Sequence, residues 1–187
     1  MNFLKILLAL ILLLVIALLG IGLFTDSKYN LSRSIEINAE KTKVWTVISS
    51  FNQFKNWSPW NKLDTAMKVT ISNPDNQVGS TYSWVGNDAA GTGSMIFLTM
   101  SKNDSFTQEI KFVEPFESIS NASMKISEEN GKTKVTWAMY GENGFIARIF
   151  MTLMGGMDKA VGKDYEEGLN NLKKLIESMP SEPNSKY

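Results

Sequence analysis

The stretch that decides the fold is TKVTWAMY at residues 133–140. Val135, Trp137 and Met139 fall on one side of this segment and alternate with polar or small residues, which predicts a strand with one buried face. Residues 106–112 show the same alternation. Two such strands indicate a curved antiparallel sheet with one face on a core and the other toward solvent.

Further strand patterns lie upstream of this segment and are separated by turn signals. Asn130-Gly131, just before it, is typical of a type I′ hairpin. The strand candidates in chain order are Leu31–Ile37, Met67–Ser72, Thr81–Val85, Ser94–Ser101, Phe106–Val113, Ser118–Ser127 and Thr133–Tyr140. The glycine-containing segment 86–93 leads into a strand pattern, so we interpret it as a hairpin and not as a phosphate-binding loop.

Helical spacing follows both the last strand candidate and the first. From Ile146 to Ile176 apolar side chains keep one stripe over about eight turns, and Gly155-Gly156 predicts a break or kink within it. Residues 44–51 have the spacing of a shorter amphipathic helix, for which Asn38 is a typical N-cap. This order predicts an α+β helix-grip fold, in which a curved antiparallel sheet of about seven strands wraps on a long C-terminal helix.

The N-terminus carries an unbroken apolar run, Ile6–Phe24, without charge or proline. As a helix, this run would extend about 28 Å, close to the roughly 30 Å hydrocarbon core of a bilayer. We therefore predict an uncleaved transmembrane anchor over residues 1–24. Two alternatives remain open. One is a buried soluble helix, and the other is a signal peptide cleaved after Gly22, for which Gly20-Ile21-Gly22 would supply the small residues.

The rest of the chain is predicted to form a linker, one domain and a tail after this anchor. Residues 25–30 are predicted to form a short polar linker, 31–178 one domain, and 179–187 a disordered tail. Six extended residues reach about 20 Å, so the domain is expected close to the bilayer. Lys5 and the amino terminus precede the run, whereas Asp26 and Lys28 cancel after it. This bias predicts a single-pass protein with a cytoplasmic N-terminus and an extracytoplasmic domain.

Composition excludes several classes of function. The chain has 19 Lys and Arg against 19 Asp and Glu, and Lys5 is the basic residue of the apolar N-terminus, so the domain is nearly neutral. This argues against nucleic acid as a partner, because such binding needs a clustered basic surface. Histidine and cysteine are absent. Their absence removes His-dependent acid–base catalysis, Ser-His and Cys-His nucleophiles, and zinc sites of the usual kind, so no metal site is predicted.

Several motifs together resemble the SRPBCC (START-like) superfamily. They are Arg33-Ser34-Ile35-Glu36-Ile37-Asn38-Ala39, Val44-Trp45, Trp57-Ser58-Pro59-Trp60, Gly79-Ser80-Thr81-Tyr82-Ser83-Trp84, Gly91-Thr92-Gly93 and Thr133-Lys134-Val135-Thr136-Trp137. Within the superfamily the chain is similar to the bacterial polyketide cyclase/dehydrase-like branch, some members of which carry an N-terminal membrane helix. The resemblance covers Leu31 to about Glu177. It implies a deep apolar cavity between the sheet and the C-terminal helix, with no metal or organic cofactor.

Aromatic residues and methionines are the candidates for lining such a cavity. Trp57 and Trp60, on either side of Ser58-Pro59, could form a lid with an indole N–H that orients a ligand, or could simply close the end of the core. The further candidates are Tyr82, Trp84, Phe112, Trp137, Met139, Phe150 and Met154. An ordinary core needs the same residue types, so the cavity interpretation depends on the family resemblance.

The polar candidates at the cavity are Asp64, Glu142 and Arg148, and Arg33 lies on the inward side of its strand. Arg33, Glu142 and Arg148 could form a buried ion pair or anchor a ligand headgroup. The alternative is that they are solvated charges at strand and helix ends. Asp64 could instead cap or clamp the Trp57–Trp60 loop.

Three functions are consistent with these patterns. The leading hypothesis is a membrane-tethered domain that binds a lipid or another hydrophobic small molecule. A cyclase- or dehydratase-type enzyme would need acid–base groups in the cavity, for which Tyr82, Asp64, Glu142 and Arg148 are the candidates. A non-catalytic interaction module for a neighbouring membrane protein would instead show a closed core and a flat apolar patch. The sequence identifies neither the ligand nor a protein partner.

Overall fold

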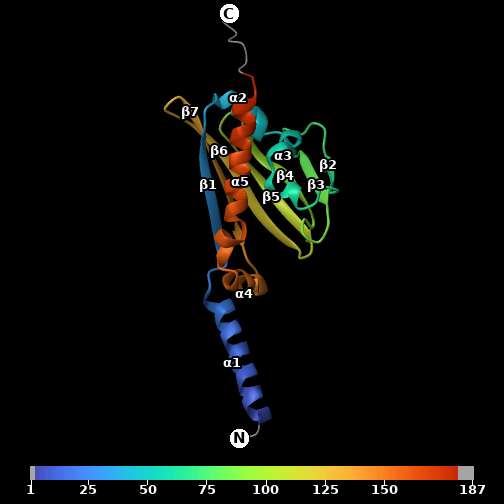
Figure 1. Cartoon of the computed structure of the whole chain (residues 1–187), viewed down its shortest axis with the longest axis vertical. Helices are drawn as coiled ribbons and strands as arrows, with labels where there is room; N and C mark the ends of the chain where they lie inside the picture. The colour runs from blue at the N-terminus through green and yellow to red at the C-terminus, as the bar shows by residue number, and fades with distance from the viewer. Residues whose placement is uncertain (1–2, 181–187) are drawn as a thin grey trace, which may run out of the picture.

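The computed structural model describes residues 3–180 and confirms the predicted α+β helix-grip architecture (Figure 1). Within this range the chain forms an antiparallel sheet of seven strands, in the order β1-β7-β6-β5-β4-β3-β2. The strands are β1 (Lys28–Ile37), β2 (Lys68–Ile71), β3 (Thr81–Val85), β4 (Thr92–Ser101), β5 (Ser105–Glu114), β6 (Ser118–Glu129) and β7 (Lys132–Glu142). The tail predicted at 179–187 lies outside the described residues from position 181 onward.

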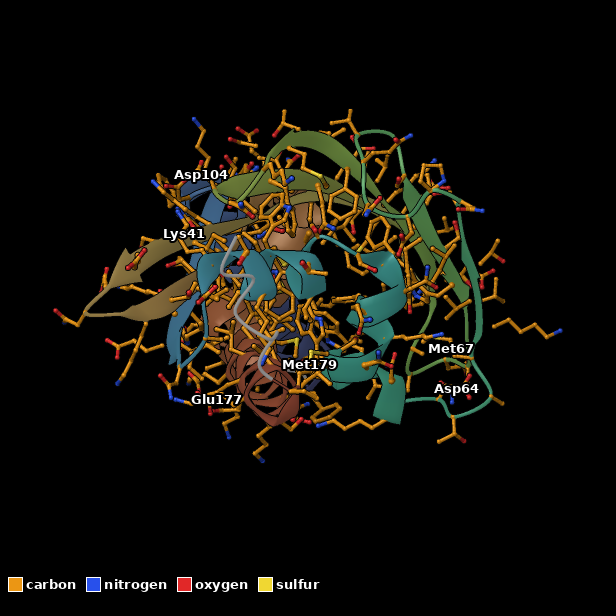
Figure 2. The ribbon with its side chains drawn as sticks, turned by 90° about the horizontal axis from the view of Figure 1, so that it is seen from above. Lys41, Asp64, Met67, Asp104, Glu177 and Met179 are labelled. Atoms are coloured by element: carbon orange, nitrogen blue, oxygen red, sulfur yellow. The ribbon has the colours of Figure 1, made fainter. Side chains whose placement is uncertain are left out.

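The helices lie at both ends of the sheet and along its concave face (Figure 1). They are α1 (Phe3–Phe24), α2 (Lys41–Ile48), α3 (Phe51–Trp57), the 3₁₀ helix η1 (Pro59–Lys62), α4 (Phe145–Leu153) and α5 (Gly156–Ser178). α1 and α4 lie at one end and α2 at the other, and α5 runs along the concave face. Seen from the end opposite α1, the sheet arches around α5 (Figure 2). The break predicted at Gly155-Gly156 is confirmed, because both residues have positive φ, +89° and +88°, in the region that favours glycine.

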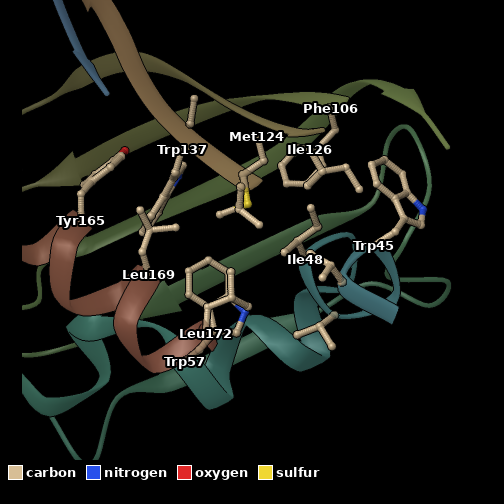
Figure 3. Close-up of a cluster of buried hydrophobic side chains, with 14 of the residues drawn as sticks. Trp45, Ile48, Trp57, Phe106, Met124, Ile126, Trp137, Tyr165, Leu169 and Leu172 are labelled. Carbon is tan, nitrogen blue, oxygen red and sulfur yellow. The ribbon is translucent and has the colours of Figure 1, made fainter. Parts of the chain in front are cut away.

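A layer of apolar side chains fills the space between the sheet and the helices (Figure 3). Met124, Ile126 and Trp137 project from the sheet and are buried. Leu169 and Leu172 of α5 meet them from the helix side. The inward side chains of the strands, at every second residue, thus pack against the apolar stripe of α5, and the two sets form one core.

Two local features differ from the sequence-based expectation. Asn38 is not the N-cap of α2, since Glu40 takes that position and the Asn38 amide donates to Glu177 Oε1 at 2.8 Å. β1 begins at Lys28, so part of the linker predicted at 25–30 belongs to the sheet. The pairing with β7 starts at Lys28 opposite Glu142, and the Tyr29 hydroxyl is hydrogen-bonded to Ser120 Oγ at 2.7 Å. Residues 25–27 remain between α1 and the sheet, a reach of about 10 Å.

Candidate ligand cavity

A cavity of about 290 Å³ lies between the sheet, η1 and the N-terminal half of α5. Its walls are mostly apolar and come from the helical segments, from four strands and from the loops beside them. The lining residues are Phe54, Ser58, Trp60, Asn61, Leu63, Met67, Tyr82, Trp84, Ala89, Ala90, Met95, Ile110, Phe112, Met139, Val161, Asp164 and Tyr165. Its volume is at the lower end of the roughly 300–1,000 Å³ typical of small-molecule pockets.

Five of the residues predicted to line a cavity do line this one: Trp60, Tyr82, Trp84, Phe112 and Met139. They come from η1, β3, β5 and β7, which are far apart in the sequence. Alternate side chains of a strand point to the same face of the sheet, and the strand residues of this set all point to the concave face. The same parity adds Met95 and Ile110, which the sequence analysis did not single out as cavity residues.

Trp57 and Trp137 lie behind the cavity rather than in its wall. They border a separate void of about 20 Å³, which has room for about one water molecule and not for an organic ligand. Their rings meet edge to face at 5.2 Å, and Trp60 packs on Trp137 at 5.6 Å. Trp57 therefore closes the end of the core, whereas Trp60 borders the cavity as well as this core.

Tyr165 on α5 is the most unusual residue of the cavity wall. Its ring stacks on Trp137 at 4.0 Å, and the two side chains lie next to each other in Figure 3. Its hydroxyl is buried and has no hydrogen-bond partner among residues 3–180. A buried hydroxyl without a partner costs about 1–3 kcal/mol. The sequence analysis did not name Tyr165 as a cavity residue. The feature that could have indicated it is a tyrosine, with its polar hydroxyl, within the apolar stripe of α5.

Burial makes the two phenols of the cavity wall still harder to ionise than a tyrosine in water. Desolvation raises the pKa of Tyr82 above its ordinary value of 10. The pKa of Tyr165 is raised further by burial, with a contribution from Tyr29. At neutral pH both side chains therefore keep their hydroxyl proton.

Polar contacts position η1 against α5. The Ser58 hydroxyl accepts a hydrogen bond from the amide of Trp60 at 3.4 Å, at the start of η1. Lys62 forms an ion pair with Glu167 of α5. The Asn171 side-chain amide donates to the carbonyl of Trp57 at 3.4 Å. These contacts place the Trp60 ring beside Tyr165, with ring centroids 6.1 Å apart.

Asp64 fastens the rim of the cavity and does not line it. Its carboxylate accepts from the amides of Ala66 and Asn87, each at 2.8 Å. The Asn87 side chain donates to the carbonyl of Leu63 at 3.2 Å, so the loop after η1 is joined to the β3–β4 turn. Figure 2 shows Asp64 and Met67 together on this side of the molecule. This geometry corresponds to the clamp that was the alternative role of Asp64.

The remaining predicted residues lie outside the cavity walls. Phe150 and Met154 belong to α4 and its C-cap and are exposed, because the break at Gly155-Gly156 separates them from the stripe of α5. Glu142 ends β7 opposite Lys28 and is also exposed. Arg148 points toward the end of α1, where its Nη1 lies 3.4 Å from the carbonyl oxygen of Thr25.

Arg33 forms an ion-pair cluster that joins β1 to α5. Its Nη2 donates to Asp158 at 2.5 Å and its Nε to Glu166 at 2.7 Å. These two carboxylates, Asp158 first, raise the pKa of the Arg33 guanidinium above its ordinary value. The cluster fixes the N-terminal half of α5, which carries Tyr165, relative to the sheet.

One side of the cavity wall lies at the end of the sheet where α1 enters. Leu63, which is 39% exposed, and Ala89 and Ala90 of the β3–β4 turn (residues 86–91) belong to this side. Because all neighbouring strands are antiparallel, this turn lies at the same end as the C-terminus of β7. Glu142 at that end pairs with Lys28, the first residue of the sheet after α1.

Acidic groups are sparse in this site. Asp164 is the carboxylate that contributes to the cavity wall. Across residues 3–180 no group of three or more Asp and Glu side chains is arranged to hold a metal ion. Besides its apolar surface, this wall contains the polar side chains Ser58, Asn61, Tyr82, Asp164 and Tyr165.

Solved structures with the same architecture come from several bacteria. A protein from Rhizobium leguminosarum is 18% identical, with a TM-score of 0.61, and the match covers 83% of this chain and 98% of that one. A Mycobacterium smegmatis protein is 20% identical, with a TM-score of 0.57, over 80% and 91% of the two chains. A protein from Arthrobacter aurescens is 16% identical, with a TM-score of 0.57, over 84% and 91%. At these identities the likeness shows the fold. A search of curated proteins gave no match.

The fold and its cavity thus define a START-like domain. Residues 28–177 match the family described as "Polyketide cyclase / dehydrase and lipid transport". The chain belongs to this family, as its sequence motifs predicted. α1 lies outside the matched range.

Proposed function

We propose that this protein is a membrane-tethered START-like domain that binds a lipid or another hydrophobic small molecule in the cavity described above. The observation that carries the proposal is a mostly apolar cavity of about 290 Å³ with Tyr82 and Tyr165 among its lining residues. An apolar wall with few polar groups suits a hydrophobic ligand. The modest volume favours one acyl chain or a small ring system over a two-chain phospholipid.

The tether in this proposal is α1. It has 22 residues with a mean hydropathy of 3.3 in its most apolar window, and its side chains are almost entirely exposed. A helix of this length extends about 33 Å, enough to cross a bilayer. The short link at residues 25–27 would hold the cavity close to the lipid surface. Such a protein would extract, sense or present a membrane-resident ligand locally.

An enzyme of the cyclase or dehydratase type would use the same cavity but has less support. Of the four acid–base candidates named from the sequence, Tyr82 lines the cavity. The carboxylate in the cavity wall is Asp164, which was not among those candidates. With a raised pKa, Tyr82 stays protonated at neutral pH and serves better as a hydrogen-bond donor than as a base. Binding is therefore the function that the wall supports best.

Native mass spectrometry of the full chain after gentle extraction tests the proposal. We expect the wild-type protein to carry an apolar adduct, and Ala89→Trp, which narrows the cavity, to lose most of it. Ala66→Trp is the matched control, since Ala66 is an exposed residue of a neighbouring loop that does not line the cavity. A wild-type protein without any adduct, or equal adduct in both variants, would contradict ligand binding in this cavity.

A further inference from the structure

The helix α4 carries apolar side chains that the domain does not cover. Ile146, Phe150, Leu153 and Met154 are exposed, from 48% for Met154 to 74% for Ile146. At 100° per residue, Ile146, Phe150 and Leu153 fall within a narrow sector of the helix. Arg148 is the charged residue of this helix. Arg148 lies on the opposite side of the helix, about 200° from Ile146. An apolar face with a basic residue on the other side is typical of a helix that lies in a membrane interface.

The position of α4 indicates what covers this face. α4 packs against the C-terminal end of α1 and lies across the base of the domain, at the level where α1 ends (Figure 1). The Phe145 ring occupies the space that a Cβ at Gly22 would need, 2.5 Å from its ideal position. Gly22 thus lets the two helices approach closely. Any bilayer that α1 crosses would therefore meet α4 at its surface.

Arg148 adds charge complementarity at the same depth. Its guanidinium lies over the Phe145 ring at 5.7 Å and reaches the carbonyl of Thr25, just after α1. Its Nε is buried and has no hydrogen-bond partner in the described part of the chain. Arginine at the level of lipid headgroups can bind phosphate oxygens while its stem stays among apolar groups.

We propose that α4 is an interfacial helix that lies in the headgroup region of the bilayer entered by α1, with Ile146, Phe150 and Leu153 facing the acyl chains. This proposal rests on the proposed membrane insertion of α1. α5 starts directly after α4 and carries Val161 and Tyr165 of the cavity wall. An α4 seated in the interface therefore fixes the orientation of the cavity, which a flexible tether alone would leave free.

Because the chain has no cysteine, single cysteines can report depth in the full-length protein. Phe150→Cys reports on the apolar face of α4, and Thr152→Cys, about 200° from Phe150 around the helix, is its matched control. Leu12→Cys reports on α1. Lys102→Cys lies in the exposed β4–β5 turn at the far end of the sheet. Each is labelled with a polarity-sensitive fluorophore and reconstituted in vesicles of phosphatidylcholine and phosphatidylglycerol. Lipids with a nitroxide near the headgroup or in mid-chain then quench the label.

We expect a blue shift at Phe150→Cys and stronger quenching there by the shallow nitroxide than by the deep one. Leu12→Cys should show the reverse order, Thr152→Cys weaker quenching than Phe150→Cys, and Lys102→Cys no quenching. Quenching at Leu12→Cys without quenching at Phe150→Cys would overturn the interfacial helix and leave the tether intact. Absence of quenching at Leu12→Cys would overturn the tether itself. An emission at Phe150→Cys that depends on the protein-to-lipid ratio would assign the face to a second copy of the chain. Leu153→Cys repeats the measurement at a second exposed position.

Discussion

Tyr165 combines two roles that can be separated by removing one atom. Its ring contributes to the core by stacking on Trp137, whereas its hydroxyl is buried without a hydrogen-bond partner among residues 3–180 and so destabilises the fold. Tyr165→Phe keeps the ring and removes the oxygen. We expect the free energy of unfolding to stay the same or to rise by up to about 1 kcal/mol, since an unsatisfied buried group is lost.

Ligand retention should change in the opposite direction in Tyr165→Phe. If the hydroxyl donates to the ligand, the variant loses adduct intensity in native mass spectra while urea unfolding shows an intact fold. Tyr140→Phe removes a hydroxyl from a tyrosine that is 36% exposed and outside the cavity wall, so it is the control. Equal retention in wild type and Tyr165→Phe would contradict a role for this hydroxyl in binding.

Single residues of the cavity were harder to predict than the strands that carry them. Tyr82, Trp84, Phe112 and Met139 could be assigned because strand parity alone decides which face a side chain takes. Tyr165 could not, since its stacking on Trp137 depends on how α5 crosses the sheet. Sequence spacing carries no information about that crossing.

The junction between α2 and α3 depends on a carboxylate from the β2–β3 loop. Burial raises the pKa of Asp75, but hydrogen bonds from the Ser50 hydroxyl at 2.6 Å and from two nitrogens of Asn52 at 2.9 Å outweigh it. The folded-state pKa therefore lies below its ordinary value of 3.8. A lowered pKa stabilises the fold above about pH 4, and this stabilisation is lost as the pH falls through the folded-state value.

Asp75→Asn should therefore act on stability in a pH-dependent way. At pH 7 we expect the variant to unfold more easily by about 1 kcal/mol, because weaker neutral hydrogen bonds replace charge-assisted ones. The difference should shrink toward zero as the pH falls through the lowered folded-state pKa of Asp75. Urea unfolding at several pH values measures it, with the exposed Asp88→Asn as control. A difference that is constant across pH would show that the ionised carboxylate of Asp75 does not stabilise this junction.

Among the elements, α4 shows where periodicity misleads. The apolar stripe from Ile146 to Ile176 suggests one continuous face, and Phe150 on that stripe and the nearby Met154 are predicted to line the cavity. The break at Gly155-Gly156 was predicted, but a break changes the direction of the preceding turns, and the sequence does not give the new direction. The same apolar face that would line a cavity in a straight helix is exposed at the base of the domain.

At the scale of the whole molecule, the architecture was predictable because its elements agree with one another. Seven alternating strands, turn signals between them and a long C-terminal stripe leave few ways to bury the apolar faces. The cavity volume was not predictable in this way. The volume depends on the distance of η1 and α5 from the sheet. Contacts such as the ion pairs of Lys62 with Glu167 and of Arg33 with Asp158 hold these elements in place.

The membrane topology is the property on which the proposed function depends most. We expect intact-mass measurement to show the complete chain, since cleavage after Gly22 would leave residues 23–187. We also expect Lys102→Cys to react with a membrane-impermeant thiol reagent added to intact cells, because the charge bias around α1 places the domain outside the cytoplasm. Asn2→Cys, at the opposite end of the apolar run, should react only after the membrane is permeabilised. A mature chain that begins at Leu23 would remove the tether and free the cavity to work away from the lipid surface. The reverse labelling pattern would keep the tether but place the cavity at the cytoplasmic leaflet, so its ligand would have to be sought there.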